Sequence, residues 1–203
     1  LIKGIDSIDN VKEELRDISV KSSITELKDK ELLVPASWFG ILNSLFIIIF
    51  APLFSKLWES KLNPSAPIKF ALGLILLGVG FGVLAYGSSG IAPGAKTASV
   101  SMIWLIFAYF FHTIGELTLS PVGLSYVSKL SPPKLLSLMF GIWFTATAIA
   151  NFFAGLMGSF IDKIADEKGL SFFFLIFTVI PIFAGLILVV IKKWMIKKMH
   201  GIE

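Results

Sequence analysis

Long stretches without any charged side chain are the strongest constraint on the fold of this 203-residue chain. A helix rises about 1.5 Å per residue, so about 20 apolar residues cross a hydrocarbon core about 30 Å thick. Four such stretches are long enough, a fifth contains a single charged residue, and none shows the strict apolar–polar alternation of a membrane barrel strand. The sequence therefore predicts an all-α, polytopic membrane helix bundle. Its five transmembrane helices are expected near residues 38–57, 68–88, 100–128, 135–160 and 170–191.

The composition agrees with this class. Apolar residues make up 55% of the chain and charged residues 16%, against about 25% charge in an average soluble domain. Both values exclude a largely disordered chain and a nucleic-acid-binding module. Cysteine is absent, so disulfides and thiolate chemistry are excluded, and no motif calls for a cofactor.

Lysines predict the orientation in the membrane. Nine lie in the connections and tail expected on one side: Lys56, Lys61, Lys69, Lys129, Lys134, Lys192, Lys193, Lys197 and Lys198. The opposite connections hold three: Lys96, Lys163 and Lys168. The richer side is expected to be cytoplasmic, which makes residues 192–203 a basic cytoplasmic tail in a cell (inner or plasma) membrane protein.

Residues 1–37 are expected to form an extracytoplasmic charged loop or tail. They carry six basic and eight acidic side chains and no apolar run typical of a signal sequence. Five spans place the two ends on opposite sides of the membrane, and the chain starts at Leu1. We therefore expect it to be the C-terminal portion of a longer protein.

One acid lies inside a predicted span. His112, Glu116 and Ser120 recur every four residues on one helix face, and Pro121 predicts a kink one turn beyond Glu116. A carboxylate at the centre of a span normally faces a cavity or a partner, so Glu116 is the leading candidate for a functional residue. His112 is either functional or a packing imidazole bonded to a backbone carbonyl. A metal site is not expected, because these ligands are too few.

Other spans contain weaker candidates. Trp143 and Thr147 share a face of the fourth span, where Trp143 is either functional or a packing residue. Beside that face, Ala146, Ala150, Ala154 and Gly158 form a stripe that would let another helix approach closely. Asn43 in the first span either binds a ligand or forms a hydrogen bond across a helix interface.

Glycines of the second span predict close packing without chemistry. No phosphate-binding loop or hydrolase triad is evident, so we do not expect an enzyme. Kinked helices with one buried acid are typical of a solute pathway.

Several runs of residues resemble the proton-dependent oligopeptide transporter family of the major facilitator superfamily. They are VPASWF at 34–39, FIIIFAPLF at 46–54, GEL at 115–117, SPVGLS at 120–125, KLSP at 129–132 and GIWF at 141–144. The similarity extends from about Leu33 to Ile191. It implies that the five spans correspond to the family's eighth to twelfth helices, with the missing N-terminal half of the transporter upstream.

The resemblance also implies a substrate site. The family's peptide-binding Asn falls on Asn43, its Glu for the peptide amino group on Glu116, and its Trp-Phe pair on Trp143 and Phe144. His112 and Thr147 lie one turn from matched positions and would border the same cavity. The family's charged first-helix motif and its basic residues for the peptide carboxylate have no counterpart in this chain.

The implied function is that of a C-terminal portion of a proton-coupled di- and tripeptide symporter. Its partners would be peptides, protons, the lipid bilayer and the other half of the transporter, with no nucleic acid. The alternatives are a related carrier for another small solute, or a non-transporting membrane scaffold or receptor subunit.

Overall fold

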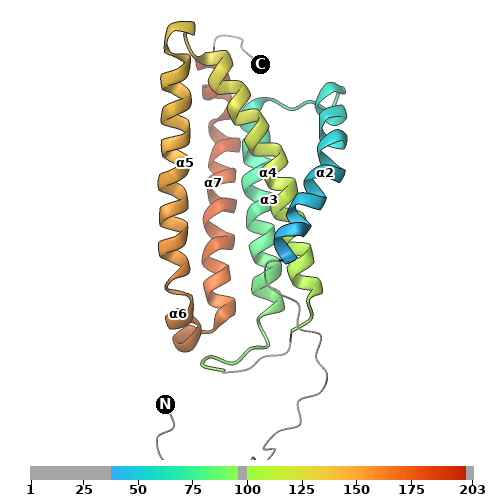
Figure 1. Cartoon of the computed structure of the whole chain (residues 1–203), viewed down its shortest axis with the longest axis vertical. Helices are drawn as coiled ribbons and strands as arrows, with labels where there is room; N and C mark the ends of the chain where they lie inside the picture. The colour runs from blue at the N-terminus through green and yellow to red at the C-terminus, as the bar shows by residue number, and fades with distance from the viewer. Residues whose placement is uncertain (1–37, 96–99, 200–203) are drawn as a thin grey trace, which may run out of the picture. The chain divides into compact units, whose positions relative to one another are not determined.

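The computed structural model describes residues 38–95 and 100–199, and within these ranges all regular structure is helical (Figure 1). The elements are α2 (Trp38–Glu59), α3 (Ala66–Gly87), α4 (Ile103–Leu130), the 3₁₀ turn η1 (Pro133–Leu135), α5 (Leu136–Gly158), α6 (Ile161–Lys168) and α7 (Leu170–Lys198). Five of the described helices are long and apolar enough to span a membrane. The all-helical fold with five spans is confirmed. The predicted extracytoplasmic loop or tail, residues 1–37, and the end of the predicted cytoplasmic tail, residues 200–203, lie outside the described residues.

Proline and glycine set several helix ends. Asn63 and Pro64 follow α2, and α3 then begins after Ser65 with a proline in its first turn, where a missing N–H is tolerated. Gly169 has φ +91°, which lets the chain reverse between α6 and α7. Pro121 lies inside α4, which continues through it as one helix, so the expected kink stays a prediction.

Two differences from the expected elements follow from local pattern. Helix α7 continues to Lys198, seven residues beyond the expected end at 191. Apolar residues such as Trp194 and Met195 lie among the lysines of this extension and line a groove with residues of α3 and α4, so the helix stays largely apolar on the side that faces those helices. Residues 161–168 were expected to be a plain connection, but they form the short helix α6, which packs against α7. Charged residues do not break a helix outside the hydrocarbon layer.

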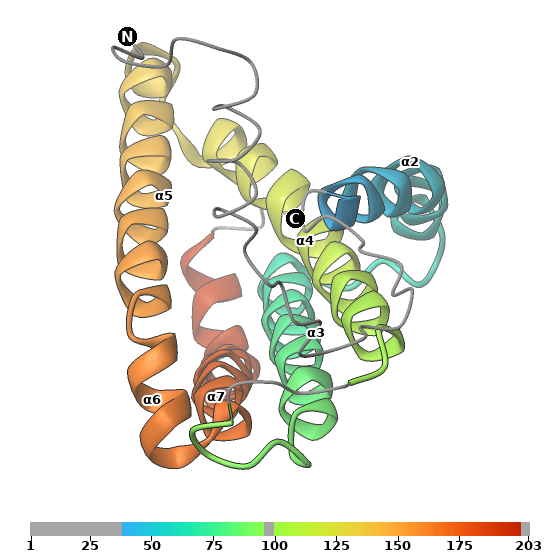
Figure 2. The ribbon, with the colours of Figure 1, turned by 60° about the horizontal axis from the view of Figure 1, so that its bottom comes forward.

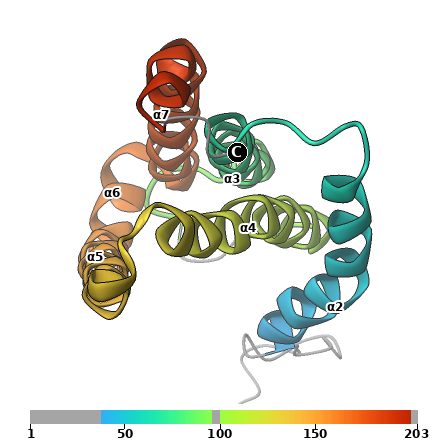
Figure 3. The same ribbon diagram turned by 90° about the horizontal axis from the view of Figure 1, so that it is seen from above.

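Helix α3 packs most extensively against its neighbours, and it lies between α7 and α4 (Figures 2 and 3). Its buried residues are mainly glycine and alanine. A Cβ on Gly73 would lie 2.8 Å from the Gly115 carbonyl oxygen of α4, and one on Gly78 would lie 2.8 Å from the Thr178 oxygen of α7. Small residues let membrane helices approach closely, so the packing predicted for this span is confirmed.

Helices α2 and α5 flank α4 (Figure 3), and neither contains a buried residue. Within the described residues, a Cβ on Gly158, the last residue of the predicted small-residue stripe, would meet nothing within 4 Å. No described helix therefore packs on this part of the predicted small-residue stripe. Glu116 lies on the helix that α2 and α5 flank.

Candidate functional site

Glu116 is an exposed side chain on α4, between the buried residues Gly115 and Leu117. Ser120, one turn further, is also exposed. Within the ranges 38–95 and 100–199, the Glu116 carboxylate has no hydrogen bond or ion pair. An unsatisfied carboxylate on an apolar helix can bind a proton or attract a cation such as an ammonium group.

His112 is turned toward α3. A Cβ on Gly80 would lie 2.6 Å from His112 Nε2, and the imidazole packs on the ring of Phe81 with 4.5 Å between centroids. Nε2 is buried and has no hydrogen-bond partner among the described residues. Of the two interpretations, these contacts favour the packing imidazole.

Asn43 contacts α4 through Thr113, which is fully buried. Thr113 Oγ1 lies 2.5 Å from the Asn43 side-chain oxygen and 2.8 Å from the Tyr109 carbonyl oxygen. A hydroxyl has one proton, so it can donate to only one of these oxygens. Both contacts are satisfied if Thr113 donates to Tyr109 and the Asn43 amide turns its N–H toward Oγ1. Asn43 is thus at a helix interface, the second alternative considered for it.

Trp143 packs back on α4. A Cβ on Gly123 would lie 2.8 Å from Trp143 Cζ2, which explains why a residue without a side chain is needed there. Trp143 also lines an apolar groove of about 450 Å³ with Phe70 and Tyr126. Phe144, with 59% of its side chain exposed, is not among the residues that line this groove.

Thr147 is exposed and donates a hydrogen bond to the Trp143 carbonyl oxygen at 3.0 Å. The structure therefore joins Asn43 with α4 and Trp143 with α4. Thr147 bonds only within its own helix, to Trp143, and neither Thr147 nor Phe144 lines the groove that Trp143 lines. No group of three or more His, Cys, Asp or Glu side chains in the described part of the chain could hold a metal ion.

Sequence reasoning missed Thr113, the residue that connects Asn43 to α4. A threonine in a span commonly bonds its own helix, as Thr113 does with Tyr109, so its presence alone gives no sign of an interhelical contact. The sequence signal that could have drawn attention to Thr113 is its position next to His112, in the span that also contains Glu116.

Comparison with known proteins identifies the family to which the chain is similar. The PTR2 model, which represents the POT family, matches residues 23–174, well over half of the chain. The chain is 36% identical over 138 residues to the peptide transporter YePEPT of Yersinia enterocolitica subsp. palearctica serotype O:3 (strain YE-P4), covering 66% of this chain and 26% of that one. It is also 36% identical over 172 residues to a di-/tripeptide transporter of Lactococcus lactis subsp. cremoris, covering 84% and 33%.

A solved structure is similar as well. The crystal structure of a mutant of peptide transporter POT in complex with alafosfalin superposes with a TM-score of 0.70 and 33% identity, covering 83% of this chain and 34% of that one. The chain spans about a third or less of the length of these proteins. The family match begins at residue 23, earlier than the Leu33 expected from the motifs, and ends at residue 174, before the expected Ile191. The resemblance is confirmed, and this multi-pass membrane chain belongs to the POT family.

Proposed function

We propose that this chain lines one side of the peptide-binding cavity of a proton-coupled di- and tripeptide symporter. The observation that carries the proposal is Glu116, an exposed carboxylate in an apolar helix of a chain that belongs to the POT family. Because it has no ion-pair partner among the described residues, its charge is available to an ammonium group or a proton. The similarity to transporters named for di- and tripeptides supports peptides as the substrate class.

Each candidate residue has a proposed role. Glu116 attracts the amino terminus of the peptide, and Asn43 forms a hydrogen bond with the peptide backbone. Asn43 can do so while it contacts Thr113, because a side-chain amide offers two N–H groups and an oxygen. Trp143 and Phe144 contact apolar peptide side chains, and Thr147 borders the cavity. We place His112 behind the cavity wall, where it supports α4 against α3.

The C-terminus is proposed to be cytoplasmic. Support comes from the nine lysines on that side against three on the other.

The experiment that tests the proposal compares two peptides in the whole transporter that contains this chain. Glu116→Gln removes the charge and nearly keeps the shape. Losing one member of a buried charge pair weakens binding by about 30-fold or more. Calorimetry at fixed pH should show this loss for a dipeptide with a free amino terminus and a much smaller loss for the acetylated dipeptide, which carries no cation.

Glu167→Gln is the matched control, since it makes the same chemical change on α6. It should leave both affinities unchanged. If Glu116→Gln weakens both peptides equally in folded protein, Glu116 does not bind the amino terminus.

A further inference from the structure

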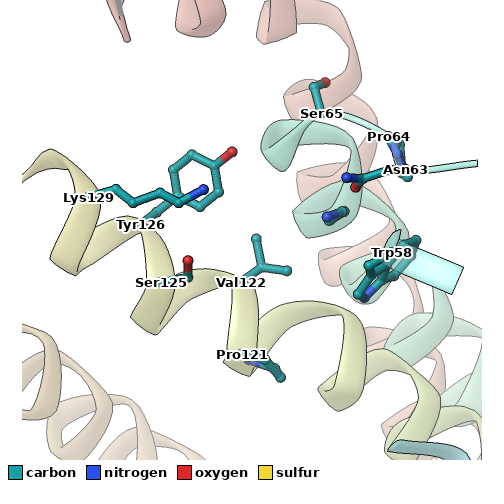
Figure 4. A pocket seen from close by; sticks show the side chains of 10 residues that line it. Trp58, Asn63, Pro64, Ser65, Pro121, Val122, Ser125, Tyr126 and Lys129 are labelled. Atoms are coloured by element: carbon teal, nitrogen blue, oxygen red, sulfur yellow. The ribbon is translucent and has the colours of Figure 1, made fainter. Parts of the chain in front are cut away.

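A second cavity, of about 410 Å³, lies where α2 ends, α3 begins and the second half of α4 passes (Figure 4). Trp58 from the last turn of α2 and Ser65 from the α2–α3 connection line one side. Tyr126 and Lys129 from α4 line the other, and Lys69 comes from the first turn of α3. The peptide-site proposal uses none of these residues.

The cavity is positively charged. Of the described residues that line it, two are lysines and none is an acid. Lys69 Nζ lies 4.7 Å from the centre of the Trp58 ring, and Lys129 Nζ lies 5.4 Å from the centre of the Tyr126 ring. The two ammonium groups line the same cavity, so their like charges repel each other. An anion between them would remove this repulsion and form hydrogen bonds with both, and the Ser65 hydroxyl, which makes no cap hydrogen bond, is a further donor.

The cavity is close to helix ends, which is where lipid headgroups are expected. Lys69 is the fourth residue of α3, and Lys129 is the last but one of α4, so each is within about one turn of a helix end. Trp and Tyr are the aromatic residues that concentrate at membrane–water interfaces. The same end of the bundle holds Lys56 and Lys61, on the side that the lysine distribution predicts to be cytoplasmic.

An apolar groove of about 300 Å³ adjoins the charged cavity. Tyr126 lines both, and the consecutive residues Ser65 and Ala66 line the cavity and the groove respectively. The groove runs between α3, α4 and α7, with Leu130 and Trp194 among its apolar walls. A charged cavity that opens onto an apolar groove fits a molecule with an anionic head and a hydrocarbon chain. A free phosphate would leave the groove empty.

We propose that this cavity binds an anionic phospholipid of the cytoplasmic leaflet. Lys69 and Lys129 hold the phosphate group, and one acyl chain occupies the groove between α3, α4 and α7. Basic pockets between transmembrane helices on the cytoplasmic side are suited to such headgroups. Neither lysine is among the residues proposed to bind the peptide.

The test uses native mass spectrometry of the whole transporter in detergent, titrated with dioleoyl phosphatidylglycerol, dioleoyl phosphatidylcholine or glycerol 3-phosphate. Two lysines near an anionic lipid should favour phosphatidylglycerol over phosphatidylcholine by about 30-fold. The double variant Lys69→Gln/Lys129→Gln should lose this preference. The matched control Lys192→Gln/Lys193→Gln removes two lysines from the predicted cytoplasmic side without touching the cavity, and it should keep the preference.

Three results would overturn the proposal: equal affinity for the two lipids, the same loss in the control variant, or saturation by glycerol 3-phosphate at the concentrations that suffice for the lipid. A second measurement does not require the lysine variants to fold. Phosphatidylglycerol brominated on its acyl chains should quench the fluorescence of the unsubstituted protein more than that of Trp194→Phe, because Trp194 lines the groove that holds the acyl chain. Equal quenching in the two proteins contradicts the site.

Discussion

Some polar side chains in the described spans form hydrogen bonds that connect neighbouring helices. Thr113 is buried completely, yet its hydroxyl contacts both Asn43 on α2 and the Tyr109 carbonyl oxygen of its own helix. Ser171 on α7 similarly donates to the Ala85 carbonyl oxygen of α3 at 2.7 Å. A polar group without a partner is costly in hydrocarbon, so such pairs fix how neighbouring helices are aligned.

Because Asn43 and Thr113 contact each other, substitutions at these two residues should not affect the stability of the protein independently. We expect Asn43→Leu and Thr113→Val to be non-additive, with an interaction energy of about 0.6 kcal/mol, the average for polar pairs between membrane helices. A double-mutant cycle on the whole protein, followed by chemical unfolding in mixed micelles, measures it. The control pair Ser44→Ala with Thr113→Val should be additive, because the Ser44 hydroxyl bonds its own helix at the Gly40 oxygen, 3.5 Å away. Additivity in both cycles contradicts the contact.

Gly78 should tolerate no side chain. A Cβ there would lie 2.6 Å from Ile182 Cγ1 and 2.8 Å from the Thr178 backbone oxygen, whereas a Cβ on Gly82 would come no closer than 3.3 Å to the Thr178 methyl. We expect Gly78→Ala to destabilise the protein by about 1–3 kcal/mol through overpacking. Gly82→Ala, one turn away on the same interface, should cost much less. Thermal unfolding followed by tryptophan fluorescence compares the two, and equal losses contradict the packing of α3 on α7.

The sequence predicts the positions of some helices better than those of others. The five apolar helices follow from the absence of charge, because a charged group inside hydrocarbon is costly whatever surrounds it. Helix α6 was missed because its residues Asp162 to Lys168 were treated only as loop charges. Neighbour relations were harder to predict. The stripe from Ala146 to Gly158 was expected to receive another helix, yet among the described helices the closest packing is at the glycines of α3.

The same limit applies to the candidate site residues: the sequence selects some of them but does not show which residues of other helices they contact. Glu116 could be selected from the sequence because it is the one acid within a span. The contact of Asn43 with Thr113 depends on how α2 and α4 are aligned, which residue spacing within either helix does not determine. The charged cavity likewise combines three elements, and Trp58 and Lys129 are far apart in sequence.

The side of the membrane on which each connection lies can be measured directly. In a cysteine-free version of the whole protein, Leu62→Cys places a thiol in the α2–α3 connection, where Leu62 is 73% exposed. Ser89→Cys places one in the α3–α4 connection. We expect a membrane-impermeant maleimide to label Ser89→Cys in intact cells and Leu62→Cys only after permeabilisation, because lysines favour the cytoplasm. The reverse pattern contradicts the proposed orientation.

The five-helix unit exposes apolar surface on most of its helices. Neither α2 nor α5 has a buried residue, and side chains as large as Trp38, Phe144 and Phe152 are more than half exposed. Lipid covers such surface on a membrane protein, and so does a second group of helices. Glu116 distinguishes the two, because a charged carboxylate is costly to leave against lipid. Its exposure therefore favours a water-filled or protein-lined face on that part of α4.

The exposed face around Glu116 leads to a prediction about whether residues 1–203 can transport peptide without the rest of the transporter. In carriers built from two halves, the substrate site lies near the midplane between them, and this chain spans about a third of the length of the relatives compared. We expect residues 1–203 reconstituted in liposomes to accumulate no labelled dipeptide under an inward proton gradient. The whole transporter in matched liposomes should accumulate it, and its Glu116→Gln variant should do so less. Circular dichroism of the reconstituted chain confirms that its helices have formed, so that a lack of uptake is not due to unfolding. Accumulation by residues 1–203 above protein-free liposomes would show that one wall of helices suffices. The proposal that Glu116 faces a cavity shared with another part of the transporter would then be wrong.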